Sequence, residues 1–328
     1  MFYTEVKIEK TPGIVVHGQK MWTIGSCFAD EIGQRLQQAM FDIRVNPCGT
    51  LYNPLSIARM LIRIANCELY SHNDIFCNNG LWHCMDFHSS FSNCDQDETL
   101  QRINNVITTL HSELPNLKLL TLTFGSARAF IRTDNGIVAG NCHKLPAENF
   151  KVTDLTADEI VRATTEAITH LRTIVPQLRI IYTVSPIRHK AYGFHADRLS
   201  KANLLIAVDR LCQLDENATY FPAYEIMNDE LRDYRFYAAD MIHPSEVACN
   251  HIYSRFADTF FTNDTRHAAD NATRLSRRLA HRPINIDSTE YATFKEGTQQ
   301  KIESLSKTHP TLAPMLNRIT DQNIFDTL

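Results

Sequence analysis

Glycine and proline are scarce in this sequence, at 11 and 12 of 328 residues. Such a low content of both excludes a collagen-like chain and a low-complexity linker. Hydrophobic residues make up 44% of the chain and charged residues 21%, which is typical of a globular protein rather than a disordered one. The length suits one large domain or two ordinary ones.

Long apolar runs and long basic runs are also missing. No segment approaches the roughly 18–20 apolar residues of a membrane-spanning helix, and the first ten residues, MFYTEVKIEK, lack the pattern of a secretory signal. The net charge is −4, and a nucleic-acid-binding domain would instead carry a basic patch. We therefore expect neither a nucleic acid nor a membrane as a partner.

The cysteines do not form pairs in the sequence. There are nine of them, an odd number, and no CxxC motif occurs. This spacing argues against a disulfide framework and favours a reducing compartment, so a cytoplasmic protein is expected. It also argues against a closed zinc site, and we expect no metal.

Short apolar runs alternate with helical periods along the chain. The apolar runs of strand length are 21–24, 42–45, 117–124, 179–184 and 219–226, and helices are expected over 199–214 and from Pro244, with Val247, Ile252 and Phe256 facing inward. Strands that alternate with helices form parallel sheets covered on both faces. The sequence therefore predicts an α/β fold, a three-layer α/β/α sandwich around a five-stranded parallel sheet.

Composition divides the chain into two predicted domains. Residues 1–262 carry the alternating pattern, interrupted at about 69–100 by a polar insertion in which Asn79-Gly80 predicts a hairpin turn. Residues 263–328 are polar and lack strand-like runs. We expect this second part to be a helical or flexible C-terminal extension.

Reactive side chains follow two of the predicted strands. Ser26 and Cys27 come directly after the first strand, and Asp240 precedes His243 by three residues after the fifth. Ligands of parallel α/β sheets bind at the carboxyl ends of the strands. Backbone N–H groups at the start of a helix are expected to lower the pKa of a thiol and to bind an oxyanion, and a carboxylate at this spacing can orient an imidazole.

A loop glycine offers a further oxyanion donor. The second strand is followed by Asn46-Pro47-Cys48-Gly49. A glycine lets its backbone N–H approach a substrate closely because it has no side chain. We therefore expect the N–H of Gly49 to face the same site as Cys27.

Six segments in order resemble a known family. The segments GSCFA, NPCGTLYNP, NCHK, SPIRH, YFPAYEIMNDELRDYRFY and DMIHPS are similar to the GSCFA family, which belongs to the SGNH/GDSL hydrolase superfamily. The resemblance covers about residues 15–260. It implies a flavodoxin-like sandwich of the SGNH hydrolase type and an esterase-type site without a cofactor.

The resemblance also implies roles for individual residues. Aligned on Gly25, the superfamily's Gly-Asp-Ser block makes Cys27 the nucleophile, and a shift by one residue would make it Ser26; Asp240 and His243 match the last block. The second block's glycine maps onto Gly49. The Asn of the superfamily's Gly-x-Asn block is missing from 124–127, FGSA, and Asn141 could replace it as an oxyanion donor.

For the other candidate site residues, a purely structural role is an alternative to the functional one. Ser26 is either a nucleophile or a helix cap. Arg188 and His189, which follow the fourth strand, and His143 are candidate substrate-binding residues or ordinary loop residues. Ser200-Lys201 matches a family position, but its ordinary interpretation is the exposed face of a helix.

The expected function is that of an esterase. Its substrate would be a small-molecule or carbohydrate ester, such as an O-acetyl carbohydrate, cleaved through a covalent acyl-enzyme. The alternatives are an acyltransferase that uses the same site and a non-catalytic ligand-binding module. A redox-sensing thiol is a third alternative, with Cys48 or Cys142 as the resolving cysteine.

Overall fold

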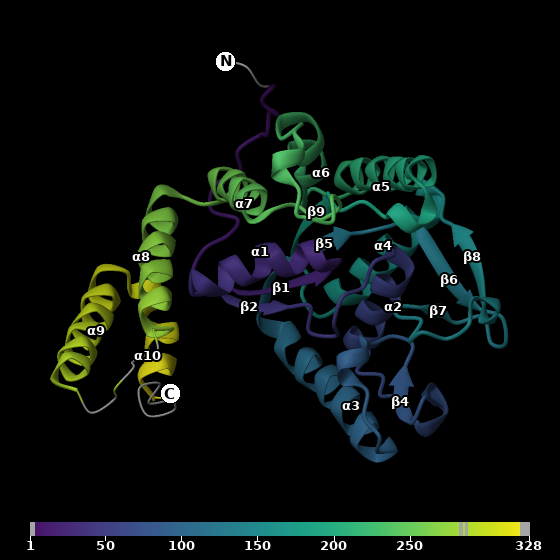
Figure 1. The fold of residues 1–328 in the computed structure, drawn as a ribbon, viewed down its shortest axis with the longest axis horizontal. Helices are drawn as coiled ribbons and strands as arrows, with labels where there is room; N and C mark the ends of the chain where they lie inside the picture. Colours follow the sequence, from purple (N-terminus) through teal and green to yellow (C-terminus); the bar gives the residue numbers. More distant parts are fainter. Residues whose placement is uncertain (1–3, 282–284, 286–287, 322–328) are drawn as a thin grey trace.

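A five-stranded parallel sheet forms the centre of the computed structural model, which describes residues 4–281, 285 and 288–321 (Figure 1). Its strands are β1 (Lys20–Gly25), β2 (Asp42–Val45), β5 (Leu117–Phe124), β9 (Arg179–Val184) and β10 (Ala218–Phe221). They lie in the order β10-β9-β5-β1-β2, which is the flavodoxin-like order. The predicted sheet is confirmed.

Helices cover both faces of this sheet. The helices α2 (Pro54–Ala65), α3 (Gln96–Glu113), α4 (Ala157–Arg172) and α5 (Phe194–Leu214) share one core with the sheet, and α1 (Cys27–Gln38) and α7 (Glu246–Phe260) share the other. Side chains of β1 alternate between these cores, with Trp22 in the first and Met21 in the second. The predicted three-layer α/β/α sandwich is therefore confirmed.

Two small antiparallel sheets are added to the sandwich. Strands β3 (Ile75–Asn78) and β4 (Leu81–Cys84) form a hairpin around Asn79-Gly80, where the sequence predicted a turn. Strands β6 (Arg128–Arg132), β7 (Val138–Ala139) and β8 (Phe150–Asp154) form a sheet in the order β7-β6-β8. The second sheet had no counterpart in the sequence analysis.

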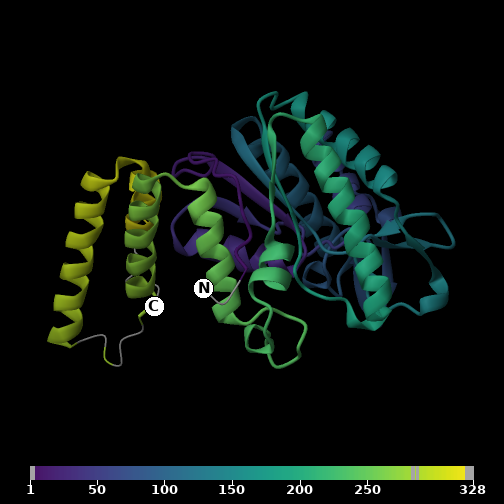
Figure 2. The same cartoon turned by 90° about the horizontal axis from the view of Figure 1, so that it is seen from above.

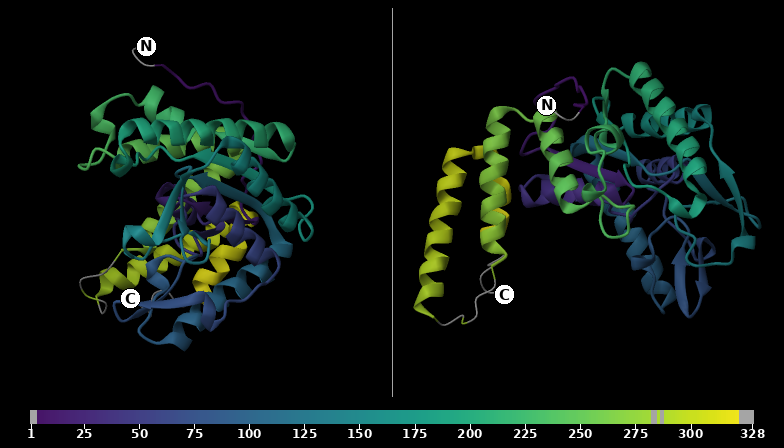
Figure 3. Two further views of the ribbon diagram at one scale, coloured as in Figure 1. Left: turned by 90° about the vertical axis from the view of Figure 1, so that its right-hand side faces the viewer. Right: turned by 45° about the horizontal axis from the view of Figure 1, so that its top comes forward.

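Three helices follow the sandwich, namely α8 (Asn263–Leu279), α9 (Thr289–Thr308) and α10 (Ala313–Asp321). Figure 2 and Figure 3 show them gathered at the side of the molecule away from the β7-β6-β8 sheet. Leu275, Ile302 and Leu316 form their core with Met40, which lies two residues after the end of α1. None of the helices in the described part of the chain is long and apolar enough to cross a membrane.

Short helical turns complete the chain. They are α6 (Ala223–Glu225), the π-helix η6 (Ile226–Glu230), and the 3-10 helices η1 (His72–Asp74), η2 (Ser89–Phe91), η3 (Leu114–Asn116), η4 (Ala147–Asn149), η5 (Lys190–Tyr192), η7 (Tyr234–Phe236) and η8 (Pro310–Leu312). Most of them lie in the loops that follow strands.

Two predicted elements need correction. The fifth strand was expected to reach residue 226 but ends at Phe221, because Ala223, Ile226 and Met227 reach the core from helical turns. This spacing of three and four residues is that of a helix. Val247 was expected to face inward but is 65% exposed, whereas Ile252 and Phe256 are buried.

Candidate active site

Ser26 caps the helix that begins at Cys27. Its hydroxyl accepts a hydrogen bond of 3.3 Å from the N–H of Phe28, and its own N–H donates to Thr123 O at 3.0 Å. The residue is 1% exposed. The structure thus uses Ser26 as an N-cap, which stabilises the first turn of α1, and puts Cys27 at the first helical position.

A glycine allows the ends of β1 and β5 to meet at this point. A Cβ atom on Gly25 would lie 2.1 Å from the carbonyl oxygen of Thr123. The Gly25 N–H donates to Asn46 Oδ1 at 2.8 Å, and its carbonyl accepts from Leu51 N at 2.9 Å. The close approach requires glycine and fixes the loop that carries Cys27.

The structure brings Cys27, His243 and Asp240 together in one chain of contacts. Cys27 Sγ lies 3.9 Å from His243 Nε2, and His243 Nδ1 lies 2.6 Å from Asp240 Oδ2. The other carboxylate oxygen, Oδ1, accepts from the N–H groups of His243 and Ile242 at 3.0 and 2.9 Å. With Nδ1 protonated toward Asp240, Nε2 is free to accept the thiol proton.

The pKa values of Asp240 and Cys27, which stand at the two ends of this series of contacts, are shifted in opposite directions. Hydrogen bonds from the N–H and side chain of His243 lower the pKa of Asp240 to about 2, so the carboxylate is ionised at any working pH. Burial and the neighbouring Asp30 raise the pKa of the Cys27 thiol. This contradicts the expectation that the helix start lowers that pKa, because loss of water around the sulfur outweighs the N–H groups.

Tyr52 is a site residue that the sequence analysis missed. Its hydroxyl lies close enough to the Cys27 thiol to act on the pKa of that thiol, which it lowers against the larger effect of burial. The Tyr52 carbonyl accepts from the N–H groups of Gly125 and Ser126 at 2.9 and 3.0 Å, which ties this loop to the end of β5. The only available signal was its place in the loop after β2, directly before the Asn53 cap of α2.

Lys201, which the sequence analysis matched to a family position, lies buried at the site. Its side chain is 1% exposed, and Nζ donates to Gly125 O and Ser185 O, both at 2.7 Å. It therefore bridges the carboxyl ends of β5 and β9. Burial lowers its pKa to about 8, while the charges of Asp197 and Cys27 act in the opposite direction.

The ordinary interpretation of Ser200-Lys201 as an exposed helix face is wrong. Both residues are buried, and Ser200 Oγ accepts from Ala127 N at 2.7 Å. A lysine in a helical sequence is normally read as exposed because its charge costs free energy to bury. Here, two strand-end carbonyls compensate for that cost, and their positions are a property of the folded sheet.

The two further oxyanion donors that the sequence predicted, Gly49 and Asn141, are held by hydrogen bonds in their own loops. The N–H of Gly49 donates to Asn46 O at 2.7 Å, and Asn141 Oδ1 accepts from His143 N at 2.8 Å. Gly49 is required for packing instead, because a Cβ atom there would lie 2.1 Å from His88 Cβ. The N–H of Gly49 is thus already used within its own loop, whereas the hydrogen bond of Asn141 involves Oδ1 rather than the Nδ2 donor, and its role at an oxyanion stays a prediction.

His143 belongs to the small β-sheet region. It is 5% exposed, with Nε2 2.7 Å from Cys84 O and Nδ1 3.0 Å from Ser89 Oγ. Burial lowers its pKa to about 4, so the ring is neutral at pH 7. Both ring nitrogens have protein partners, and a substrate-binding role has no support from this geometry.

Arg188 and His189 lie on the side of the site formed after β9. His189 packs its ring against Tyr52 and Tyr192, with centroids 5.8 and 5.6 Å away. Its pKa is lowered to about 4, chiefly by burial, with a smaller effect of the charge of His243. Arg188 Nη2 donates to Asn228 Oδ1 at 3.0 Å, and its side chain lines a cavity described below.

The described residues contain no cluster of three His, Cys, Asp or Glu side chains suited to a metal ion. The nine cysteines are all free thiols. Of the two expected resolving cysteines, Cys48 is 1% exposed and Cys142 is half-buried, and burial raises the pKa of both. A buried thiol of raised pKa is a poor partner for disulfide exchange.

Comparison with known proteins gives a clear relationship. A search of curated proteins found no match to the chain. The family model of a GSCFA domain protein, C-terminal domain, matches residues 273–318, which include the end of α8 and all of α9. The model of the GSCFA family matches residues 20–256, from the start of β1 into α7 and including Cys27, Asp240 and His243, and the chain therefore belongs to the GSCFA family.

Proposed function

We propose that this protein is an ester hydrolase that uses Cys27 as a nucleophile. The observation that carries the proposal is the chain of contacts from Cys27 through His243 to Asp240, at 3.9 and 2.6 Å. A nucleophile within reach of a base, which a third group orients, is the common arrangement for acyl transfer.

The reaction begins from a neutral thiol. Because the pKa of Cys27 is raised, His243 Nε2 must take the thiol proton as the sulfur bonds to the ester carbonyl carbon. The tetrahedral oxyanion then collapses, the carbon–oxygen bond to the alcohol breaks, and His243 returns the proton to the departing alcohol. The product left on the enzyme is a thioester.

Hydrolysis of the thioester uses the same groups. His243 Nε2 takes a proton from water as the water oxygen adds to the thioester carbonyl. The carbon–sulfur bond breaks, and the sulfur recovers its proton from His243 while the carboxylic acid leaves. Asp240 stabilises the imidazolium in both halves and stays ionised, in keeping with its pKa of about 2.

Two donors interact with the sulfur in the free protein and are our candidates for the oxyanion. They are the N–H of Cys27 and the hydroxyl of Tyr52. A donor at the reacting atom stabilises the charge that develops on the carbonyl oxygen, and removal of one such donor typically costs about 10²–10³ in rate. We propose these two ahead of Gly49, because the N–H of Gly49 already donates to Asn46 O.

Placement in the SGNH/GDSL superfamily is part of the proposal. Three features support it: the flavodoxin-like strand order, a nucleophile directly after β1, and an aspartate three residues before the histidine. Cys27 stands where that superfamily has serine. By analogy with the superfamily, we propose an O-acyl ester as substrate, with O-acetyl carbohydrates as the first class to assay.

The cytoplasm remains the proposed compartment. It rests on the nine free cysteines, because a reducing compartment keeps thiols unpaired.

The proposal is tested by turnover of 4-nitrophenyl acetate in four variants. We expect Cys27→Ala to abolish turnover and Cys27→Ser to leave a weak oxygen nucleophile. His243→Ala should lose about 10²–10⁴ in rate with unchanged melting, because its side chain is 49% exposed and contributes little packing. Ser26→Ala should retain turnover but lower the melting temperature through the lost helix cap.

The exposed cysteine Cys94 provides a matched control. Alkylation that labels Cys27 should abolish turnover, and a Cys94→Ala variant should behave as wild type throughout. Full activity of Cys27→Ala, with an inactive but folded Ser26→Ala, would assign the chemistry to the hydroxyl. Absence of saturable turnover with any ester tested would favour the non-catalytic binding module.

A further inference from the structure

A cavity of about 840 Å³ opens beside the proposed site. It is lined by residues of α5, of η6 and of the loop that carries His243. Met241, two residues before His243, and Arg188, next to His189, form its border with the site. This volume falls within the range of small-molecule pockets and is far larger than an acetyl group.

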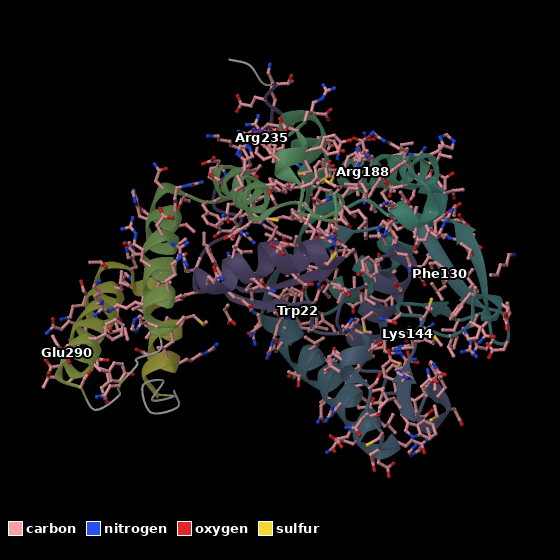
Figure 4. The ribbon with its side chains drawn as sticks, in the orientation of Figure 1. Trp22, Phe130, Lys144, Arg188, Arg235 and Glu290 are labelled. Atoms are coloured by element: carbon pink, nitrogen blue, oxygen red, sulfur yellow. The ribbon has the colours of Figure 1, made fainter. Side chains whose placement is uncertain are left out.

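Three arginines line this cavity without an acidic partner. Arg188, Arg198 and Arg232 come from three different segments, and no described carboxylate lies within ion-pair distance of them, in contrast to Arg235, which pairs with Asp233 at 3.1 Å. Figure 4 labels Arg188 and Arg235 on the same side of the molecule, by α5 and α6.

Arg188 is held in position for a ligand. Its Nη2 donates to Asn228 Oδ1 at 3.0 Å, and Asn228 in turn donates to Tyr224 O at 2.7 Å. Both Arg188 and Arg198 lie close enough to Tyr224 for their charges to lower its pKa, although burial raises that pKa overall. The neutral amide orients one guanidinium and leaves its charge uncompensated.

The charges of the lining favour an anion. Asp229 and Asp233 also line the cavity, and the ion pair with Arg235 neutralises Asp233. Asp229 is then the carboxylate of the lining that remains to balance the three guanidinium groups, which leaves a local excess of two positive charges. A phosphate monoester carries about −1.5 to −2 at pH 7, and guanidinium groups bind phosphate through paired N–H donors.

From these observations we infer that the cavity is a phosphate-binding subsite, and that the substrate of the neighbouring thiol is an ester which also carries a phosphate group. The inference rests on the proposed function for the ester bond, but the phosphate site stands on the arginines alone. Phe194, Tyr234 and Met241, which are exposed apolar side chains of the same lining, would contact the carbon skeleton between phosphate and ester.

Binding of inorganic phosphate tests the site without any turnover. We expect saturable binding by calorimetry to the full chain and to Cys27→Ala alike. Arg188→Gln and Arg198→Gln should each raise the dissociation constant for phosphate by about tenfold or more, because each removes a charge-assisted contact. The matched control is Arg162→Gln, an exposed arginine of α4, which should bind phosphate as wild type does.

A second measurement separates the subsite from the esterase proposal. The ratio of kcat/KM for an O-acetylated glycerol phosphate to kcat/KM for 4-nitrophenyl acetate should fall about tenfold in Arg188→Gln. Phosphate binding without turnover would refute the esterase and leave the subsite intact. Turnover without phosphate binding, binding of succinate in preference to phosphate, or equal loss of binding in Arg162→Gln would overturn the subsite.

Discussion

The Lys201→Met variant tests the most unusual electrostatic feature of the site. Lys201 Nζ donates to Gly125 O and Ser185 O, which lie at the ends of two neighbouring strands. Methionine keeps much of the hydrocarbon chain and removes the charge and both donors. The titratable or charged groups that act on this ammonium are Asp197, Cys27 and Arg188.

The expected change in the free energy of unfolding follows from the pKa of the buried Lys201 amine. It is about 8, compared with 10.5 for an unperturbed lysine. Between these values the unfolded chain binds a proton that the folded chain has released, so the contribution of Lys201 to the free energy of unfolding rises with pH. From about pH 7.5 to about pH 9.5 the rise should be about 2 kcal/mol.

The assay is urea unfolding at both pH values, followed by the fluorescence of tryptophan, since Trp22 is buried in the central sheet. The stability of wild type relative to Lys201→Met should increase by about 2 kcal/mol at the higher pH. Lys118→Met, at an exposed position of β5, should show no such change. A stability difference that is equal at both pH values would refute the reasoning.

Three further predictions concern the site and its frame. Asp240→Asn should lower esterase turnover by about 10²–10⁴, because it removes the carboxylate that lies 2.6 Å from His243 Nδ1 and is ionised at working pH; unchanged turnover in steady-state assays would contradict this. Gly25→Ala should cost about 2–6 kcal/mol in urea unfolding, since its Cβ would meet Thr123 O at 2.1 Å, whereas Gly136→Ala, which meets no atom within 4 Å, should cost less. As pH falls from 6.5 to about 4, where the pKa of His143 lies, wild type should lose up to about 3 kcal/mol more than His143→Gln does in the same titration, because His189, whose pKa is also about 4, is present in both proteins.

The central sheet could be predicted because its strands are buried on both faces. The predicted limits of 117–124 and 179–184 match β5 and β9, since continuous apolar runs of this length have few other uses. The strands β6 to β8 are only partly buried and carry no such run. Their pairing depends on contacts between residues distant in the chain, and the sequence gives no local signal for them.

Contacts between segments also limited what could be predicted of the site. Cys27, Asp240 and His243 follow strands, and a parallel sheet brings the ends of its strands to one edge, so their proximity could be expected. The Gly49 N–H and Lys201 Nζ both donate to backbone carbonyl groups. Every residue has such a group, so the sequence does not indicate which one will be the partner. Sequence patterns identify reactive side chains, but the hydrogen bonds of the backbone appear only in the fold.

If Cys27 is the nucleophile that we propose, the charges around it explain how a thiol can take the place of a hydroxyl. Burial and Asp30 both disfavour the thiolate, so the resting site holds a neutral sulfur, which reacts slowly with oxidants because the thiolate is the reactive form. In the proposed mechanism, the proton leaves only when a carbonyl carbon is available to the sulfur, and His243 then holds that proton for the alcohol. The charge of Cys27 acts to raise the pKa of Lys201, and in the proposed mechanism the protonated amine would stabilise negative charge on the sulfur. The raised pKa therefore suits the proposed nucleophile, which must stay unreactive until an ester is bound.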